Sequence, residues 1–96
     1  MTVTSAKGFV ASGIAAGLKA SGKPDVALVV NNGPKYAAAG VFTSNRIKAA
    51  PVLWSQQVLQ AGELKAVASN SGGANACTGP DGFGDTHKTA EWVAAL

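Results

Sequence analysis

The chain has 96 residues, enough for at most one small domain. Its net charge is +3, and the basic residues are dispersed rather than clustered among aromatic residues, which argues against a nucleic-acid-binding protein. Hydrophobic residues make up 47% of the chain but aromatic residues only 6%, and the abundant alanine adds little area to a core, so we expect one layer of a larger fold.

Two apolar runs near the start of the chain predict strands. Residues 9–18 alternate between two faces, which predicts a short strand with a bend at Gly13 or Gly17, and a turn follows at residues 21–24. Residues 25–30 form a continuous run rich in β-branched residues, typical of a strand buried on both faces.

The next apolar run, residues 36–43, follows a segment with strong turn chemistry at residues 31–34. A short loop between two apolar runs favours an antiparallel hairpin. Three consecutive alanines would also suit a helix, but Gly40 and the β-branched end of the run favour a strand.

Residues 49–62 are expected to form a helix, with Pro51 in its first turn and Gly62 at its exit. The helix is apolar on two faces, which predicts that it lies between layers, with Trp54 as a core anchor. Residues 65–69 are expected to form a third strand.

A second helix is expected over residues 85–96, with Asp85 as its N-cap. Its apolar stripe shows no stop signal before the chain ends, so we expect an incomplete domain that exposes apolar surface and associates when isolated. The stripe consists of Thr89, Trp92, Val93 and Leu96.

Together the elements predict an α/β fold over residues 1–96: a mixed sheet with an antiparallel hairpin, and packing helices.

The densest group of polar residues is the decapeptide at residues 70–79, which holds two Asn, a Ser, a Thr, a Cys and three Gly. It follows the third strand, the position where α/β proteins place ligands. Asn70 and Asn75 are therefore candidate substrate-binding residues that shape a site. The alternative is a structural loop in which asparagine side chains bond the local backbone.

Other chemistry is weakly supported by the sequence. Cys77 is the only cysteine and His87 the only histidine; we expect a buried structural cysteine and a surface histidine rather than a catalytic pair. Asp81, Asp85 and Glu91 form no obvious acid–base pair, and no metal site or phosphate-binding glycine motif is present. A lone cysteine and the lack of an apolar leader or membrane span in the sequence predict a cytoplasmic protein without membrane partners.

Several ordered segments resemble the bacterial ornithine acetyltransferase family, also called glutamate N-acetyltransferase, of arginine biosynthesis. The decapeptide is close to the family signature Asn-Ser-Gly-x-Ala-Asn-Ala-Cys-Thr-Gly. The other similar segments lie in the same order as in the family, at residues 8–19, 25–29, 36–45 and 48–52.

The resemblance implies the N-terminal part of the first subunit of an enzyme that moves acetyl from N2-acetylornithine to L-glutamate. Such enzymes cleave themselves and use the freed threonine of the second subunit as nucleophile, without a bound cofactor; some members also use acetyl-CoA as a substrate. That threonine and the family's Ser-Thr-Gly oxyanion motif are not among these residues, so no catalytic residue is assigned and the isolated chain is expected to be inactive. The implied partners are the small-molecule substrates, the remainder of the first subunit, and the second subunit.

Two rival interpretations stay open at this point. One is a related self-cleaving threonine enzyme of the aminopeptidase type. The other is a small independent binding module that uses the loop from Asn70 to Asn75.

Overall fold

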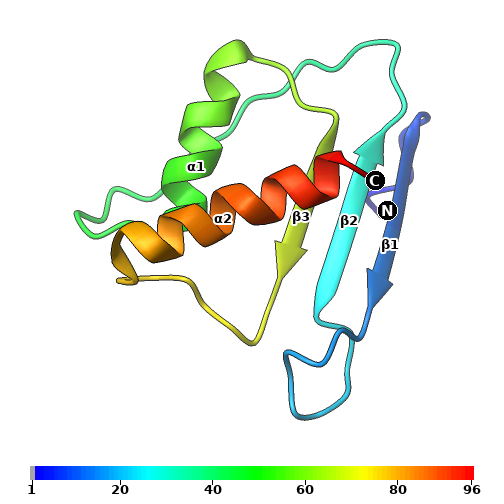
Figure 1. The fold of residues 1–96 in the computed structure, drawn as a ribbon. Helices are drawn as coiled ribbons and strands as arrows, with labels where there is room; N and C mark the ends of the chain where they lie inside the picture. The colour runs from blue at the N-terminus through cyan, green and yellow to red at the C-terminus, as the bar shows by residue number, and fades with distance from the viewer. Residues whose placement is uncertain (1) are drawn as a thin grey trace. The chain divides into compact units, whose positions relative to one another are not determined.

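The computed structural model describes residues 2–96, which form two compact units. The strand unit comprises the residues up to Ala37 together with Glu63–Ala74, and the helical unit comprises Ala38–Gly62 and Asn75–Leu96 (Figure 1).

The strand unit is a three-stranded antiparallel sheet in the order β1-β2-β3. Its strands are β1 (Phe9–Ile14), β2 (Val26–Asn31) and β3 (Ala66–Asn70), which confirms the three strands expected around residues 9–18, 25–30 and 65–69. The β-branched run forms the central strand, β2, because both of its edges are paired and its side chains are mostly half-buried.

The predicted hairpin between residues 25–30 and 36–43 is wrong. The strand β2 uses its two edges for β1 and β3, and of residues 36–43 only Ala37 makes a bridge, to Glu63. All strand pairs among residues 2–96 are antiparallel, so this part of the sheet has no parallel pair.

The helical unit contains α1 (Ala50–Val58), which continues as the 3-10 helix η1 (Leu59–Ala61), and α2 (Gly79–Ala94). The first helix confirms the expectation for residues 49–62: Pro51 lies in the first turn, and Gly62 ends the helix with a φ of 72°. The two helices pack through Trp54, whose ring meets Phe83 edge-on at 6.2 Å and stacks on His87 at 4.4 Å.

The helix α2 begins six residues before the expected start at Asp85, which is therefore not its N-cap. Thr78 occupies the N-cap position, and Pro80 and Asp81 lie in the first turn. Proline is tolerated there, and an acidic residue is favoured by the helix dipole, so a segment that resembled a loop is a helix start. The Asp85 carbonyl lies inside the helix and accepts a hydrogen bond from the Thr89 hydroxyl.

The apolar stripe predicted for α2 is also displaced. Trp92 is 69% exposed and Leu96 98% exposed, so these two residues of the predicted stripe are not covered in this chain, whereas Trp54, the expected core anchor, is half-buried. The half-buried positions of α2 are spaced three and four residues apart and consist of Phe83, Thr86, Ala90 and Val93.

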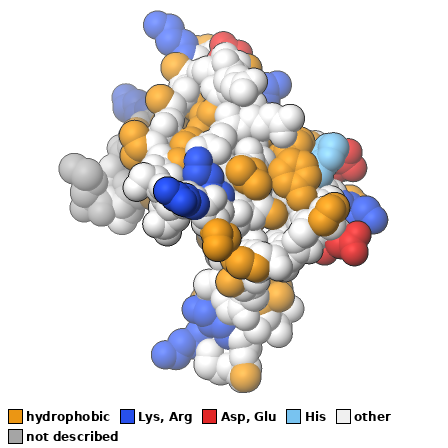
Figure 2. Space-filling view, turned by 90° about the vertical axis from the view of Figure 1, so that its left-hand side faces the viewer, with side chains coloured by type: hydrophobic (Ala, Val, Ile, Leu, Met, Phe, Trp, Pro, Cys, Tyr) orange, Lys and Arg blue, Asp and Glu red, His pale blue; other side chains and the backbone are white. Residues whose placement is uncertain are grey.

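Little of the apolar content is fully buried. Among residues 2–96, Ala50 is the only buried hydrophobic residue, and Asp25 is the only buried charged one. Large apolar side chains such as Val41, Ile47 and Ile14 are exposed, and hydrophobic side chains reach the surface on the face shown in Figure 2.

Within the described range of residues, no helix is both long and apolar enough to cross a membrane.

Candidate functional site

The decapeptide at residues 70–79 begins in the strand unit and ends in the helical unit. Asn70 is the last residue of β3 and pairs with Val26 across the sheet. The next residue, Ser71, donates its backbone N–H to the carbonyl of Asp25 at 2.8 Å. The first part of the decapeptide is thus held by the start of β2.

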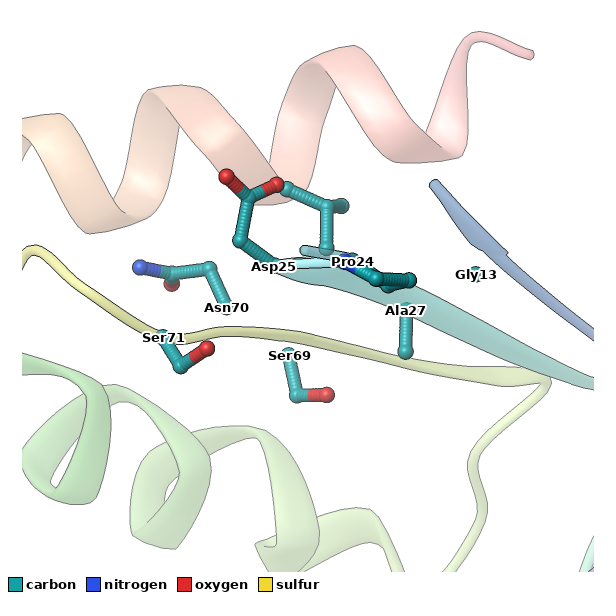
Figure 3. A pocket seen from close by; sticks show the side chains of 8 residues that line it. Gly13, Pro24, Asp25, Ala27, Ser69, Asn70 and Ser71 are labelled. Carbon is teal, nitrogen blue, oxygen red and sulfur yellow. The ribbon is translucent and has the colours of Figure 1, made fainter. Parts of the chain in front are cut away.

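A shallow hollow of about 200 Å³ lies at this end of the strand unit (Figure 3). The side chains of Ser69 and Asn70 point to opposite sides of β3 in that view. Asn70 is exposed and lines the hollow, so its amide is available to a polar ligand. The lining residues are Gly13, Pro24, Asp25, Val26, Ala27, Ser69, Asn70 and Ser71.

Asp25 is the organising residue of this region, and the sequence analysis missed its role. The residue is only 4% exposed. One carboxylate oxygen accepts the backbone N–H of Ala16 at 2.7 Å, and the other accepts those of Leu18 at 2.7 Å and Lys19 at 3.0 Å.

These hydrogen bonds, led by the one from Ala16, hold the pKa of the Asp25 carboxyl below its usual 3.8, while burial opposes them. The carboxylate is therefore ionised at neutral pH, and its oxygens are used to fix the loop between β1 and β2. An aspartate directly between a Ser-Gly-Lys-Pro turn and an apolar strand was the available signal in the sequence.

The loop that Asp25 fixes also supports the decapeptide. Gly72 has a φ of +93°, and a Cβ added there would lie 2.9 Å from the Lys19 side chain and 3.3 Å from the Leu18 backbone. Only glycine suits both the left-handed conformation and this close approach. The first glycine of the signature, Gly72, is therefore explained by packing within the strand unit.

Asn75 holds the second half of the decapeptide. Its side-chain amide donates to the Gly82 carbonyl at 2.7 Å and to the Thr86 hydroxyl at 2.9 Å, and its side-chain oxygen accepts a hydrogen bond from the Thr78 hydroxyl. Its backbone carbonyl accepts the N–H of Ala50 at 3.2 Å. Asn75 thus joins the first turns of α1 and α2.

This arrangement gives Asn70 and Asn75 different properties. Both amide hydrogens of Asn75 are used within the helical unit, whereas Asn70 presents an exposed amide in the strand unit. Direct contact of either residue with a substrate stays a prediction. The hydrogen bond from the Asn75 side chain to the Gly82 carbonyl agrees with the alternative of a structural loop, in which asparagine side chains bond the local backbone.

Gly82 is buried in the first part of α2 because the Asn75 network leaves no room for a side chain. A Cβ at this position would overlap the Thr78 side chain and lie 2.6 Å from Oδ1 of Asn75. The same helix has a second glycine, Gly84, where an added Cβ would meet no atom within 4 Å apart from its chain neighbours and the backbone of its own helix. The two positions therefore differ in packing, although both are helical.

The expected burial of Cys77 is wrong for this chain. Cys77 is exposed and adopts a positive φ of 57°, which few residues other than glycine favour. His87 lies on the surface as expected, 50% exposed, with Nε2 3.2 Å from Oε1 of Glu91 and its ring on Trp54. No hydrogen bond joins Cys77 to His87 in the described part of the chain.

Residues 2–96 do not assemble a reaction centre of their own. No serine, threonine or cysteine side chain among them is hydrogen-bonded to a histidine or carboxylate side chain, the pairing that activates such nucleophiles. Within the same residues, no cluster of three or more His, Cys, Asp or Glu could hold a metal ion. What this part of the chain builds is a loop fixed at both ends.

The chain is similar in sequence and structure to proteins of arginine biosynthesis. The chain is 74% identical, over 98% of its length, to the arginine biosynthesis bifunctional protein ArgJ of Streptomyces avermitilis. Its structure is similar to that of the ornithine acetyltransferase of Mycobacterium tuberculosis complexed with ornithine, with a TM-score of 0.96 and 71% identity over 97% of this chain. The ArgJ protein of Bacillus halodurans is 41% identical over 92% of the chain, with a TM-score of 0.85.

The matches cover only part of the relatives. The chain spans about a quarter of the curated Streptomyces avermitilis protein, and it covers 48% of the solved Mycobacterium tuberculosis chain and 46% of the Bacillus halodurans chain. The model of the ArgJ family matches residues 10–96, which is most of the sequence. This match and the high identity of the relatives show that the chain belongs to the ArgJ family.

Proposed function

We propose that the whole protein to which this chain corresponds transfers an acetyl group from N2-acetylornithine to L-glutamate in arginine biosynthesis. The observation that carries the proposal is the similarity, at 71% identity and a TM-score of 0.96, to an ornithine acetyltransferase complexed with ornithine. Ornithine is the amine that remains when N2-acetylornithine gives up its acetyl group. The relatives named for arginine biosynthesis support the same assignment.

The reaction is proposed to pass through an acetyl-threonine outside residues 1–96. The threonine hydroxyl attacks the acetyl carbonyl, the amide C–N bond breaks, and ornithine leaves with the proton on its amine. The α-amine of glutamate then attacks the ester, the C–O bond breaks, and the hydroxyl is regenerated. Because residues 2–96 contain no activated nucleophile, this chemistry is assigned to the rest of the protein.

Coverage of the Mycobacterium tuberculosis relative supports cleavage into two subunits. The chain covers 23% of the curated protein from that organism but 48% of the solved ornithine acetyltransferase chain. The solved chain is thus about half as long as the whole gene product, as expected if the protein is divided into two chains of similar length. We assign the nucleophilic threonine to the N-terminus of the second subunit, where its own α-amine serves as base.

The part played by residues 2–96 in this proposal is to fix the decapeptide. Asp25 and Gly72 hold its first half in the strand unit, and Asn75 holds its second half at the starts of α1 and α2. A loop after a β-strand and before a helix is a common place for ligand contacts. We therefore propose that Asn70 and Asn75 shape the substrate site, Asn70 by its exposed amide and Asn75 by internal hydrogen bonds.

The proposal includes a cytoplasmic location, no bound cofactor, and no nucleic-acid or membrane partner. Acetyl-CoA is a second candidate acetyl donor, which would add the first step of the pathway to the same site.

The test is an assay of the whole protein with N2-acetylornithine and L-glutamate, with ornithine and N-acetylglutamate measured by chromatography. We expect both products in equal amounts, and no turnover by the 96-residue chain alone. A parallel reaction with acetyl-CoA in place of N2-acetylornithine tests the second donor. Release of free acetate without N-acetylglutamate, or peptide cleavage instead of acetyl transfer, would contradict the proposal.

A further inference from the structure

The segment of residues 39–45 has the composition of a strand but no strand partner. It contains Val41, Phe42 and Thr43, which favour β-structure. Among the described residues, none of its backbone N–H groups donates to another backbone group, and the only hydrogen bond from them goes from Asn45 to the Thr43 hydroxyl at 3.2 Å. The segment lies in the connection between β2 and α1 (Figure 1).

The segment is nevertheless attached to the helical unit on one side. A Cβ added to Gly40 would lie 2.9 Å from Cδ1 of Leu59 and 3.3 Å from the Phe42 ring, so the backbone passes close to η1 with Phe42 folded beside it. Phe42 is 37% exposed, whereas the adjacent Val41 is 99% exposed. All of residues 39–45 are exposed, and Val41 is the less covered of these two apolar side chains.

An uncovered β-branched side chain beside unpaired backbone groups is a template for strand addition. The ArgJ relatives extend well beyond the matched segment, since this chain spans only 24% of the Streptomyces avermitilis protein. The whole protein therefore has ample chain to supply a partner.

We propose that residues 39–45 pair, in the whole protein, with a β-strand from the part of that protein outside these 96 residues. The side chain of Val41 is then covered by the same part of the protein. The surface is an internal interface of the assembled enzyme. The inference concerns assembly and stands whether or not the proposed acetyl transfer is correct.

The test uses the whole protein in its processed form. Hydrogen–deuterium exchange should show the amides of residues 39–45 exchanging about a hundredfold more slowly than in the denatured protein, as paired strand amides do. In a second arm, p-benzoylphenylalanine replaces Val41 and is photo-activated, and the captured peptide is identified by mass spectrometry. The same probe at Lys23, in the exposed turn before β2, is the matched control.

We expect the probe at position 41, but not the one at position 23, to capture a peptide from outside residues 1–96 of the same protein. The proposal is overturned if residues 39–45 exchange as fast as in the denatured protein. It is equally overturned if the probe captures no peptide, or captures residues 1–96 of a second copy.

Discussion

Replacing each of the two glycines of α2 by alanine should change the stability of the helix in opposite directions. Alanine is the better helix former, so Gly84→Ala, whose methyl group meets no other part of the protein within 4 Å beyond its own helix, should stabilise α2 by about 0.5–1 kcal/mol. Gly82→Ala has the same intrinsic gain but places a methyl group on the Thr78 side chain and 2.6 Å from Asn75 Oδ1.

The cost at Gly82 outweighs the gain. Overpacking of this kind costs roughly 1–3 kcal/mol. Displacing Thr78 also removes its hydrogen bond to Asn75, a loss of about 0.5–1.5 kcal/mol. After the intrinsic gain is subtracted, Gly82→Ala should destabilise α2 by roughly 0.5–4 kcal/mol.

The assay is native-state hydrogen exchange of the α2 amides in the whole protein, supported by thermal unfolding of the same variants. We expect Gly82→Ala to speed exchange and Gly84→Ala to slow it. If Gly82→Ala protects α2 as well as Gly84→Ala does, the packing of Thr78 and Asn75 against Gly82 is not the constraint described above.

Three further predictions concern the two ends of the decapeptide. Asn75→Ala should remove the hydrogen bonds that its amide donates to the Gly82 carbonyl and the Thr86 hydroxyl, and should destabilise α2 by about 1–3 kcal/mol, measured by the same exchange experiment; unchanged exchange would refute the network. Asp25→Asn should lower the unfolding temperature at pH 7. The pKa of Asp25 is lowered in the folded protein, so the stabilisation by its carboxylate is complete above pH 3.8 and is lost as the pH falls below that value. A difference in unfolding temperature between variant and wild type that does not shrink in acid would contradict this. Cys77→Gly should be at least as stable as the wild type, since glycine suits the φ of 57°. The variant should also keep kcat within about tenfold of the wild type. A loss of several orders of magnitude in kcat, with the protein still folded, would give the thiol a catalytic role.

The regular elements could be predicted where the signal is local. The β-branched run before Asn31 and the proline and glycine at the ends of α1 act through their own backbone preferences, and the structure confirms them. The hairpin prediction failed because strand pairing is non-local: β3, more than thirty residues along the chain, occupies the edge of β2 that the 36–43 run was expected to take. Short loops between apolar runs favour hairpins only when no better partner exists.

The start of α2 and the role of Asp25 were missed for a related reason. The sequence Gly-Pro-Asp-Gly has loop chemistry, and its helical state depends on Asn75 bonding Gly82 and Thr86 across the first turn. Asp25 resembled the first residue of a strand, and only the folded loop shows three backbone N–H groups converging on its carboxylate. The decapeptide itself was recognised as a family signature, but its bonding pattern is a property of the fold.

The measurement that tests the central claim most directly is the mass of the acetyl-enzyme. The whole protein is incubated with N2-acetylornithine in the absence of glutamate, and its chains and peptides are analysed by mass spectrometry. We predict one acetyl group on the N-terminal threonine of the second subunit, none on any peptide from residues 1–96, and loss of that acetyl group when glutamate is added. Acetylation of Cys77 or of any hydroxyl within residues 1–96, or full transfer activity with no acetylated threonine, would contradict the claim that this segment only supports a site completed elsewhere.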